Sequence, residues 1–336
     1  MIRGGWIALL AGTAAAVTAC AGPFGSAVAG GPDDPVQQSG PITYGHDGHP
    51  AATCEGETDA LDYVVQWPAV PGQHPVVFGM TGTGFAGAAA CDPKTHQDGY
   101  RGFDGAMRSW AAAGYVAVNI DYHGYRDKLF GNLTYPGKGK WGDVADGTVQ
   151  LDIKPAIEYF LHHDPQQYGA DLSQGAIAFG ASSGAHNAYM LAITGVPGVR
   201  IAAAAGWSGF PDMSLAGSYA HWIFNHYMRS TPGSDVENFA DPEHRLRAGS
   251  PPEYVANGTL EFIRPANAEQ YAATCTRLHI AFCYERIVNT RNHADFYARY
   301  IFTGHAPEVT SPRAVTGQTV TEDSIAFANT VLAAAR

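Results

Sequence analysis

The sequence predicts an α/β protein whose mostly parallel, doubly wound sheet is flanked by helices. Short apolar runs alternate with helical patterns at least five times along the chain, which is typical of such sheets. One of these runs leads directly into the turn Gly180-Ala-Ser-Ser-Gly184 and then into a helix of small residues. With 336 residues, of which 46% are hydrophobic, the chain is large and apolar enough for one sizeable core.

The order of the elements follows from the spacing of the apolar residues. Residues 61–67 alternate in polarity, which predicts an early antiparallel strand. Further strands are expected over 75–80, 115–120, 176–179, 199–205, 253–257 and 279–288, and helices over 103–113, 152–161, 183–192, 267–274, 294–302 and 322–335. Residues 212–250 carry several aromatic side chains and no regular period, which predicts a small irregular cap over a site.

The first residues are typical of an export signal. Arg3 precedes an apolar run over 6–17, and Val17-Thr-Ala-Cys20 resembles the lipobox of bacterial lipoproteins, in which the cysteine receives the lipid. We therefore expect a lipoprotein signal peptide over 1–19, a flexible tether rich in Gly and Pro over 20–50, and a single folded α/β domain over 51–336. The alternative is an ordinary cleaved signal, a coincidental Cys20 and a secreted protein.

The remaining cysteines suggest disulfides, because an exported protein meets an oxidising environment. We expect the sequence-local pairs Cys54–Cys91 and Cys275–Cys283, one of three possible connectivities, and free buried thiols are the alternative. The chain has no Cys-x-x-Cys spacing, so the sequence favours neither a metal site nor a redox site. A net charge of −11 argues against nucleic acid and against electrostatic docking on a membrane, so the expected membrane contact is the lipid anchor alone.

Ser182 is the candidate nucleophile. The pattern Gly-x-Ser-x-Gly between a buried strand and a helix, here Gly180–Gly184, is that of a nucleophile elbow, a sharp turn that pushes one hydroxyl out into a site. Ser182 could also simply cap the helix. A serine hydroxyl needs a histidine to take its proton. In enzymes that carry a serine on this kind of turn, the order along the chain is Ser, acid, His. His293 follows the last expected strand and fits, whereas His279 is expected within that strand and His305 in a tail after a helix.

The acid that orients the histidine should also follow a strand, because ligands bind at the carboxyl ends of parallel strands. Glu261 follows the strand over 253–257 by a short turn, and we favour it. Asp212, after the preceding strand, is the competitor, and Asp295 is a weaker rival because it is expected on the next helix. Attack by a serine on a carbonyl carbon creates a negatively charged oxygen, the oxyanion, which needs N–H donors. We expect these donors to be the N–H of Ser183 and the glycine-rich loop 81–85.

From about residue 60 onward these segments resemble the α/β-hydrolase superfamily, in particular esterases of the hormone-sensitive-lipase and feruloyl-esterase types. The resemblance rests on residues 75–78 with Thr81-Gly-Thr-Gly-Phe85, on the segment 111–122 ending in Asp121-Tyr, on the elbow, and on residues 251–261. It implies that Thr83 and Gly84 also offer oxyanion N–H groups. In the related loop a histidine stands where this chain has Thr81, and aspartate is usual where this chain has Glu261.

The sequence thus predicts an exported serine hydrolase that cleaves small-molecule or lipid-like carboxylic esters without a cofactor. A lipase, a polyester hydrolase or a peptidase could use the same residues, and a non-catalytic binding protein could retain the fold. Four aromatic residues after the elbow suggest an apolar substrate pocket, although each could equally pack in the core: Trp207, Phe210, Trp222 and Phe224.

Overall fold

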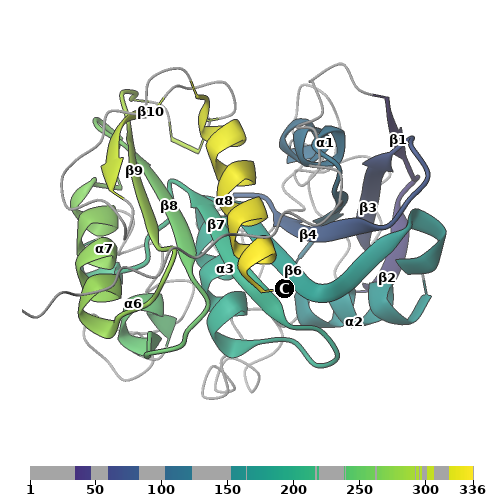
Figure 1. Ribbon diagram of the computed structural model, residues 1–336, viewed down its shortest axis with the longest axis horizontal. Helices are drawn as coiled ribbons and strands as arrows, with labels where there is room; N and C mark the ends of the chain where they lie inside the picture. Colours follow the sequence, from purple (N-terminus) through teal and green to yellow (C-terminus); the bar gives the residue numbers. More distant parts are fainter. Residues whose placement is uncertain are drawn as a thin grey trace, which may run out of the picture.

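The computed structural model describes residues 35–46, 60–82, 103–122, 153–163, 165–215, 218, 238, 240–261, 263–291, 293–294, 296, 301–305 and 318–335. Over these residues, ten strands form one sheet in the order β1-β3-β5-β4-β6-β7-β8-β9-β10, with β2 paired to β3 (Figure 1). The strands are β1 (Val36–Gln38), β2 (Ile42–His46), β3 (Ala60–Pro68), β4 (His74–Met80), β5 (Val116–Ile120), β6 (Ala170–Ala181), β7 (Ile201–Trp207), β8 (Glu253–Gly258), β9 (Tyr284–Val288) and β10 (Ile301–His305). The helices are α1 (Asp104–Ala112), α2 (Ile153–His163), α3 (Ser183–Thr194), α6 (Pro242–Arg245), α7 (Ala266–Leu278) and α8 (Val320–Ala334), with 3-10 turns η3 (Pro165–Tyr168) and η4 (Met213–Leu215).

The centre of the sheet is parallel and its edges are antiparallel. The strands from β5 through β4, β6, β7 and β8 to β9 pair in parallel, whereas β1, β2 and β3 pair antiparallel at one edge and β10 does so at the other. The predicted fold class is therefore confirmed. Since parallel strands all end at one edge, the residues that follow β4, β6, β7, β8 and β9 gather there.

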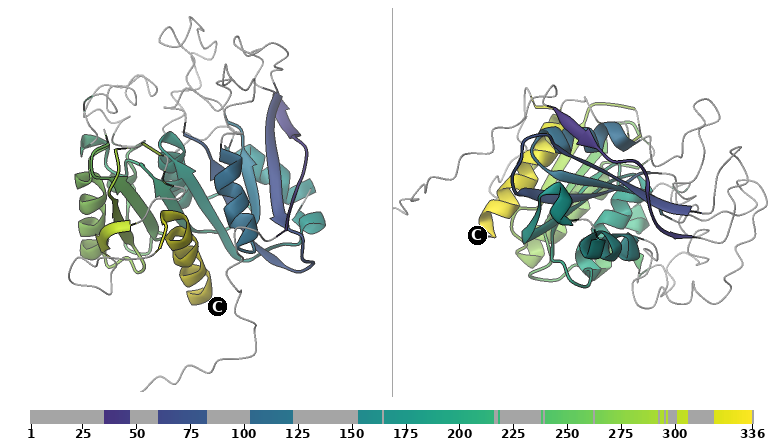
Figure 2. Two further views of the ribbon diagram at one scale, coloured as in Figure 1. Left: turned by 90° about the horizontal axis from the view of Figure 1, so that it is seen from above. Right: turned by 90° about the vertical axis from the view of Figure 1, so that its right-hand side faces the viewer.

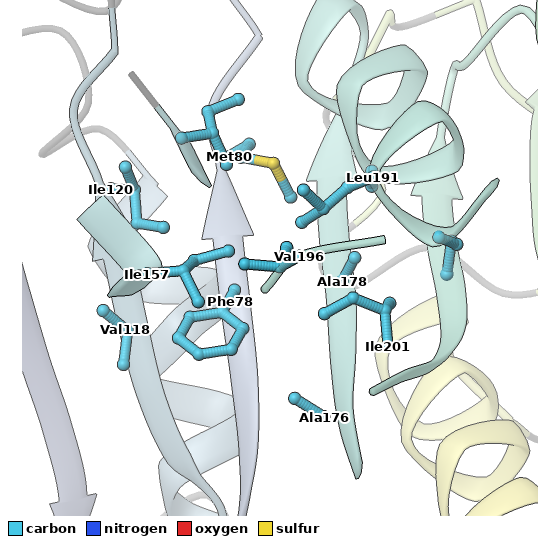
Figure 3. Close-up of a cluster of buried hydrophobic side chains, with 14 of the residues drawn as sticks. Phe78, Met80, Val118, Ile120, Ile157, Ala176, Ala178, Leu191, Val196 and Ile201 are labelled. Atoms are coloured by element: carbon cyan, nitrogen blue, oxygen red, sulfur yellow. The ribbon is translucent and has the colours of Figure 1, made fainter. Parts of the chain in front are cut away.

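Each face of the sheet carries its own hydrophobic core, because side chains alternate along every strand. On β4, for example, Phe78 and Met80 belong to one cluster and Val77 to the other. Helices α2, α3 and α7 cover the first face and α1 and α8 cover the second (Figure 2). Figure 3 shows the first cluster, with Ile157 of α2 beside Phe78 and Leu191 of α3 near Met80.

The amino-terminal edge differs from the expectation. Strands β1 and β2 fall within the range predicted to be a tether, yet both pair with β3, so the sheet already includes residues 36–38 and 42–46. Edge strands such as these are held mainly by backbone hydrogen bonds to the neighbouring strand. Their own sequence therefore need not show a regular apolar pattern.

Two expectations near the carboxyl terminus are wrong. The strand predicted over 279–288 begins only at Tyr284, because α7 continues to Leu278 and His279 caps it in a left-handed conformation (φ 55°). The helix predicted over 294–302 is not a helix at its end, since β10 begins at Ile301 and pairs antiparallel with β9. His305 is accordingly the last residue of a strand and does not lie in a tail after a helix.

Several predicted features lie wholly or mostly outside the described residues. These are the signal segment with Cys20, the pair Cys54 and Cys91, and most of the cap over 212–250, of which η4 and α6 are described. A disulfide joins Cys275 of α7 to Cys283, just before β9. In the part of the chain that the structure describes, no helix is long and apolar enough to cross a membrane.

Candidate active site

Ser182 occupies the sharp turn between β6 and α3. Its backbone has a positive φ (φ 53°, ψ −122°), a conformation that is costly for a residue with a side chain and that clusters at functional sites. The turn is tight: a Cβ on Gly180 would lie 2.2 Å from the Gly184 oxygen, and one on Gly184 would lie 2.1 Å from the Met80 oxygen. The Ser182 side chain makes no capping hydrogen bond to α3, so its hydroxyl is not used as a helix cap.

The Ser182 hydroxyl meets His293, and His293 meets Glu261. The distances are 2.7 Å from Ser182 Oγ to His293 Nε2 and 2.7 Å from His293 Nδ1 to Glu261 Oε2. An ionised carboxylate can only accept, so in this arrangement Nδ1–H donates to Glu261 and the neutral ring leaves Nε2 free to accept the Ser182 proton. The Glu261 side chain is fully buried, while 24% of the His293 side chain is exposed.

Glu261 is held for this contact by the turn that follows β8. The backbone N–H of Gly258 donates to its Oε1, which leaves Oε2 for His293. The competitor Asp212 is engaged elsewhere: its Oδ1 accepts from the backbone N–H (2.8 Å) and the hydroxyl (2.6 Å) of Ser214. Asp295 lies outside the described residues.

The other side of Ser182 faces the end of β4. Gly82 comes so close that a Cβ there would lie 2.5 Å from the Ala181 oxygen, so only glycine allows the loop this approach. Ser183 opens α3, and the amino terminus of a helix favours developing negative charge. The expected donors Thr83 and Gly84 lie outside the described residues.

Three further groups that support the site were not predicted from the sequence. Tyr122, which follows β5, donates to the Thr81 carbonyl (2.7 Å) and lies 3.4 Å from Ser183 Oγ, so it joins the β4 loop to the elbow. Ser208 accepts from the N–H of Ala294, next to His293, at 2.7 Å. The third is the Gly258 N–H beneath Glu261. Their one common signal is that Tyr122, Ser208 and Gly258 stand at strand ends.

Burial strongly shifts the pKa of two further side chains, His186 of α3 and Glu253 at the start of β8. Burial lowers the pKa of His186 to about 3, and its Nδ1 lies 3.5 Å from the Phe210 carbonyl. Burial also raises the pKa of Glu253 well above its usual value, and neither of its carboxyl oxygens has a hydrogen-bond partner among the described residues. Of the aromatic residues suggested for a pocket, Trp207 and Phe210 are buried, while Trp222 and Phe224 lie outside the described residues.

No family model and no curated protein sequence matches this chain. Solved structures do: esterase B from Lactobacillus rhamnosis aligns with a TM-score of 0.52 at 16% identity, over 77% of this chain and 75% of that one. The propionate-bound esterase Est2 from Thermogutta terrifontis aligns with a TM-score of 0.53 at 16% identity, over 88% of this chain and 93% of that one. Its butyrate-bound structure gives 0.54 at 15% identity, with the same coverage. The chain has the α/β-hydrolase fold.

In the α/β-hydrolase fold the nucleophile stands on a strained turn between a strand and a helix, and acid and histidine follow later strands. In this chain Ser182 follows β6, Glu261 follows β8, and His293 follows β9. Ser182, Glu261 and His293 are therefore connected by hydrogen bonds, and each follows the carboxyl end of a parallel strand.

Proposed function

We propose that this protein is a serine hydrolase that cleaves carboxylic esters through an acyl-enzyme formed on Ser182. The observation that carries the proposal is the continuous hydrogen-bonded series from Ser182 through His293 to Glu261. This series pairs a hydroxyl with a base and the base with an orienting acid, which is what nucleophilic catalysis by serine requires. The printed names of the structural neighbours, which are esterases, add support.

The first step forms the acyl-enzyme. Ser182 Oγ attacks the ester carbonyl carbon while His293 Nε2 takes the hydroxyl proton, and Glu261 stabilises the resulting imidazolium. Collapse of the tetrahedral intermediate breaks the bond to the alcohol, which leaves with the proton from His293. Water then repeats the sequence with His293 as base, so the acid is released and Ser182 recovers its proton.

The tetrahedral intermediate carries a negative oxygen that needs fixed donors. We assign these to the Ser183 N–H at the start of α3 and to the loop that begins at Gly82, with Thr83 and Gly84 as the donors that the family resemblance implies. The close approach of Gly82 to Ala181 and Ser182 supports this assignment, because it places the start of that loop beside the elbow.

Short acyl chains are the proposed substrates. Propionate and butyrate are named in the Est2 structures, and a tributyrin phosphonate is named in an esterase B structure. A panel of p-nitrophenyl esters from acetate to palmitate, together with peptide and polyester substrates, distinguishes this proposal from a lipase, a peptidase and a polyester hydrolase.

The test of the reaction is turnover of p-nitrophenyl butyrate by the wild type and by Ser182→Ala. We expect the variant to lose at least about 10⁴-fold in kcat. Ser173→Ala is the matched control, because Ser173 is an exposed serine at the opposite end of the same strand, β6. Equal rates for Ser182→Ala and the wild type would contradict the proposal, and an inactive wild type would favour a non-catalytic binding protein.

We also propose that the protein is exported and anchored by a lipid on Cys20. The lipobox-like run ending at Cys20 supports the anchor, and the Cys275–Cys283 disulfide supports an oxidising compartment. Cys20→Ser should move the protein from the membrane fraction to the soluble fraction. An unchanged membrane fraction would contradict anchoring at this residue.

A further inference from the structure

The dipeptide Trp207-Ser208 links the backbones on either side of the candidate site. It stands at the carboxyl end of β7, next to the elbow. The N–H of Ser182 donates to the Trp207 carbonyl at 2.8 Å, and the N–H of Ser208 donates to the Ala256 carbonyl of β8 at 2.7 Å. The dipeptide is therefore bonded both to the residue that would attack and to the strand that leads to Glu261.

The Ser208 hydroxyl makes a third link, to the loop that carries His293. Ser208 is fully buried, and its Oγ accepts the backbone N–H of Ala294 at 2.7 Å. Both residues have a positive φ, 50° at Ser208 and 60° at Ala294. Such conformations persist in side-chain-bearing residues when their surroundings hold them, and here one hydrogen bond joins the two.

This hydrogen bond acts on His293 through the peptide bond. The Ala294 N–H belongs to the same planar peptide unit as the His293 carbonyl, so a fixed N–H also fixes the direction in which the His293 backbone leaves the loop. Earlier in the loop, the Leu260 N–H donates to the Thr290 carbonyl at 3.1 Å, three residues before His293. On the carboxyl-terminal side of His293, Ser208 supplies a hydrogen bond to the very next residue, Ala294.

We propose that Ser208 is a positioning residue that holds His293 in line between Ser182 and Glu261. The inference rests on the proposed function, since positioning affects a rate only if His293 is the base. An imidazole that must meet two partners, each at 2.7 Å, tolerates little displacement, and misplacement by about 1 Å can cost about 100-fold in rate.

The test compares Ser208→Gly and Ser208→Ala with the wild type. Both variants remove the acceptor of the Ala294 N–H, but glycine also removes the cost of the positive φ, whereas alanine keeps it. We expect both to lower kcat for p-nitrophenyl butyrate by about 10- to 100-fold, with KM within about twofold and a nearly unchanged melting temperature for Ser208→Gly. Ser109→Ala is the control, because that hydroxyl donates to a carbonyl of its own helix, α1.

Hydrogen exchange of residues 289–296 gives a second readout that does not depend on activity. Ser208→Gly should lose protection at the Ala294 amide, while Ser109→Ala should not. A lower melting temperature with unchanged kcat would show a merely structural role and overturn the proposal, as would unchanged exchange. An inactive wild type would overturn the proposed function alone, since the exchange still decides whether Ser208 holds the loop.

Discussion

Gly82 and Ser182 are in such close contact that a Cβ on Gly82 would lie 2.6 Å from the Ser182 Cβ. Gly82 follows β4 and Ser182 follows β6, two strands that pair in parallel with Met80 opposite Gly180. This register brings the two strand ends side by side. Gly82, just after β4, can therefore lie directly against Ser182 because it has no side chain.

Gly82→Ala should impair the reaction more than the fold. The new methyl group would press on the Ala181 carbonyl and on Ser182, moving the loop away from the developing oxyanion, and we expect about a 100-fold loss of kcat. Gly105→Ala is the control, because nothing lies within 4 Å of a Cβ there and alanine favours the α1 helix. Steady-state kinetics and thermal melting measure both effects. Full activity of folded Gly82→Ala would contradict this role for the β4 loop.

Glu261→Gln should reduce kcat by about 10⁴-fold with KM little changed. An amide can donate to Nδ1, which would place the ring proton on Nε2 and block acceptance of the Ser182 proton. Asp212→Asn tests the competing acid, and we expect its kcat to remain within about threefold of the wild type because Asp212 is bonded to Ser214. The opposite pattern, with Asp212→Asn inactive and Glu261→Gln active, would assign the acid to Asp212.

Glu253→Gln should change the pH dependence of stability. Burial raises the folded-state pKa of Glu253, so the folded chain binds its proton more tightly than the unfolded chain does, and stability falls as pH rises above the unfolded pKa. The glutamine side chain of the variant does not titrate, so this pH dependence is absent from the variant. The free energy of unfolding of the variant relative to that of the wild type should therefore rise as pH increases from about 5, by at most about 1.4 kcal/mol per pH unit.

Urea denaturation at pH 5, 6, 7 and 8 measures the effect of Glu253→Gln. The matched control is Glu269→Gln, an exposed glutamate on α7, which should leave the slope unchanged. Parallel pH curves for the wild type and Glu253→Gln would show that Glu253 does not hold its proton in the folded state.

The sequence predicts the central sheet and the elbow well because both depend on local patterns. Buried parallel strands are continuous apolar runs, and the turn at Ser182 requires glycines at 180 and 184 because neighbouring backbone fills the space of a side chain. Glu261 and His293 could be chosen by one rule, that the side chains of a site lie just after the carboxyl ends of parallel strands. The structure brings these two side chains and Ser182 into contact.

The edges and the supporting residues could not be predicted in this way. Strands β1, β2 and β10 are held by pairing with β3 and β9, which no local pattern in their own residues reveals. Ser208 acts through one backbone N–H, and a lone serine after a strand has no distinctive spacing. The left-handed cap at His279 depends on where α7 ends, which moved the start of β9 by five residues from the expected position.

The most direct test of the central claim is the site of covalent modification by an activated phosphonate ester. The wild-type protein would be treated with a fluorophosphonate, digested, and mapped by tandem mass spectrometry. We expect one adduct, on the Ser182 oxygen, with its formation slowed strongly in His293→Ala. An adduct on another serine, or none on an ester-hydrolysing wild type, would contradict Ser182 as the nucleophile.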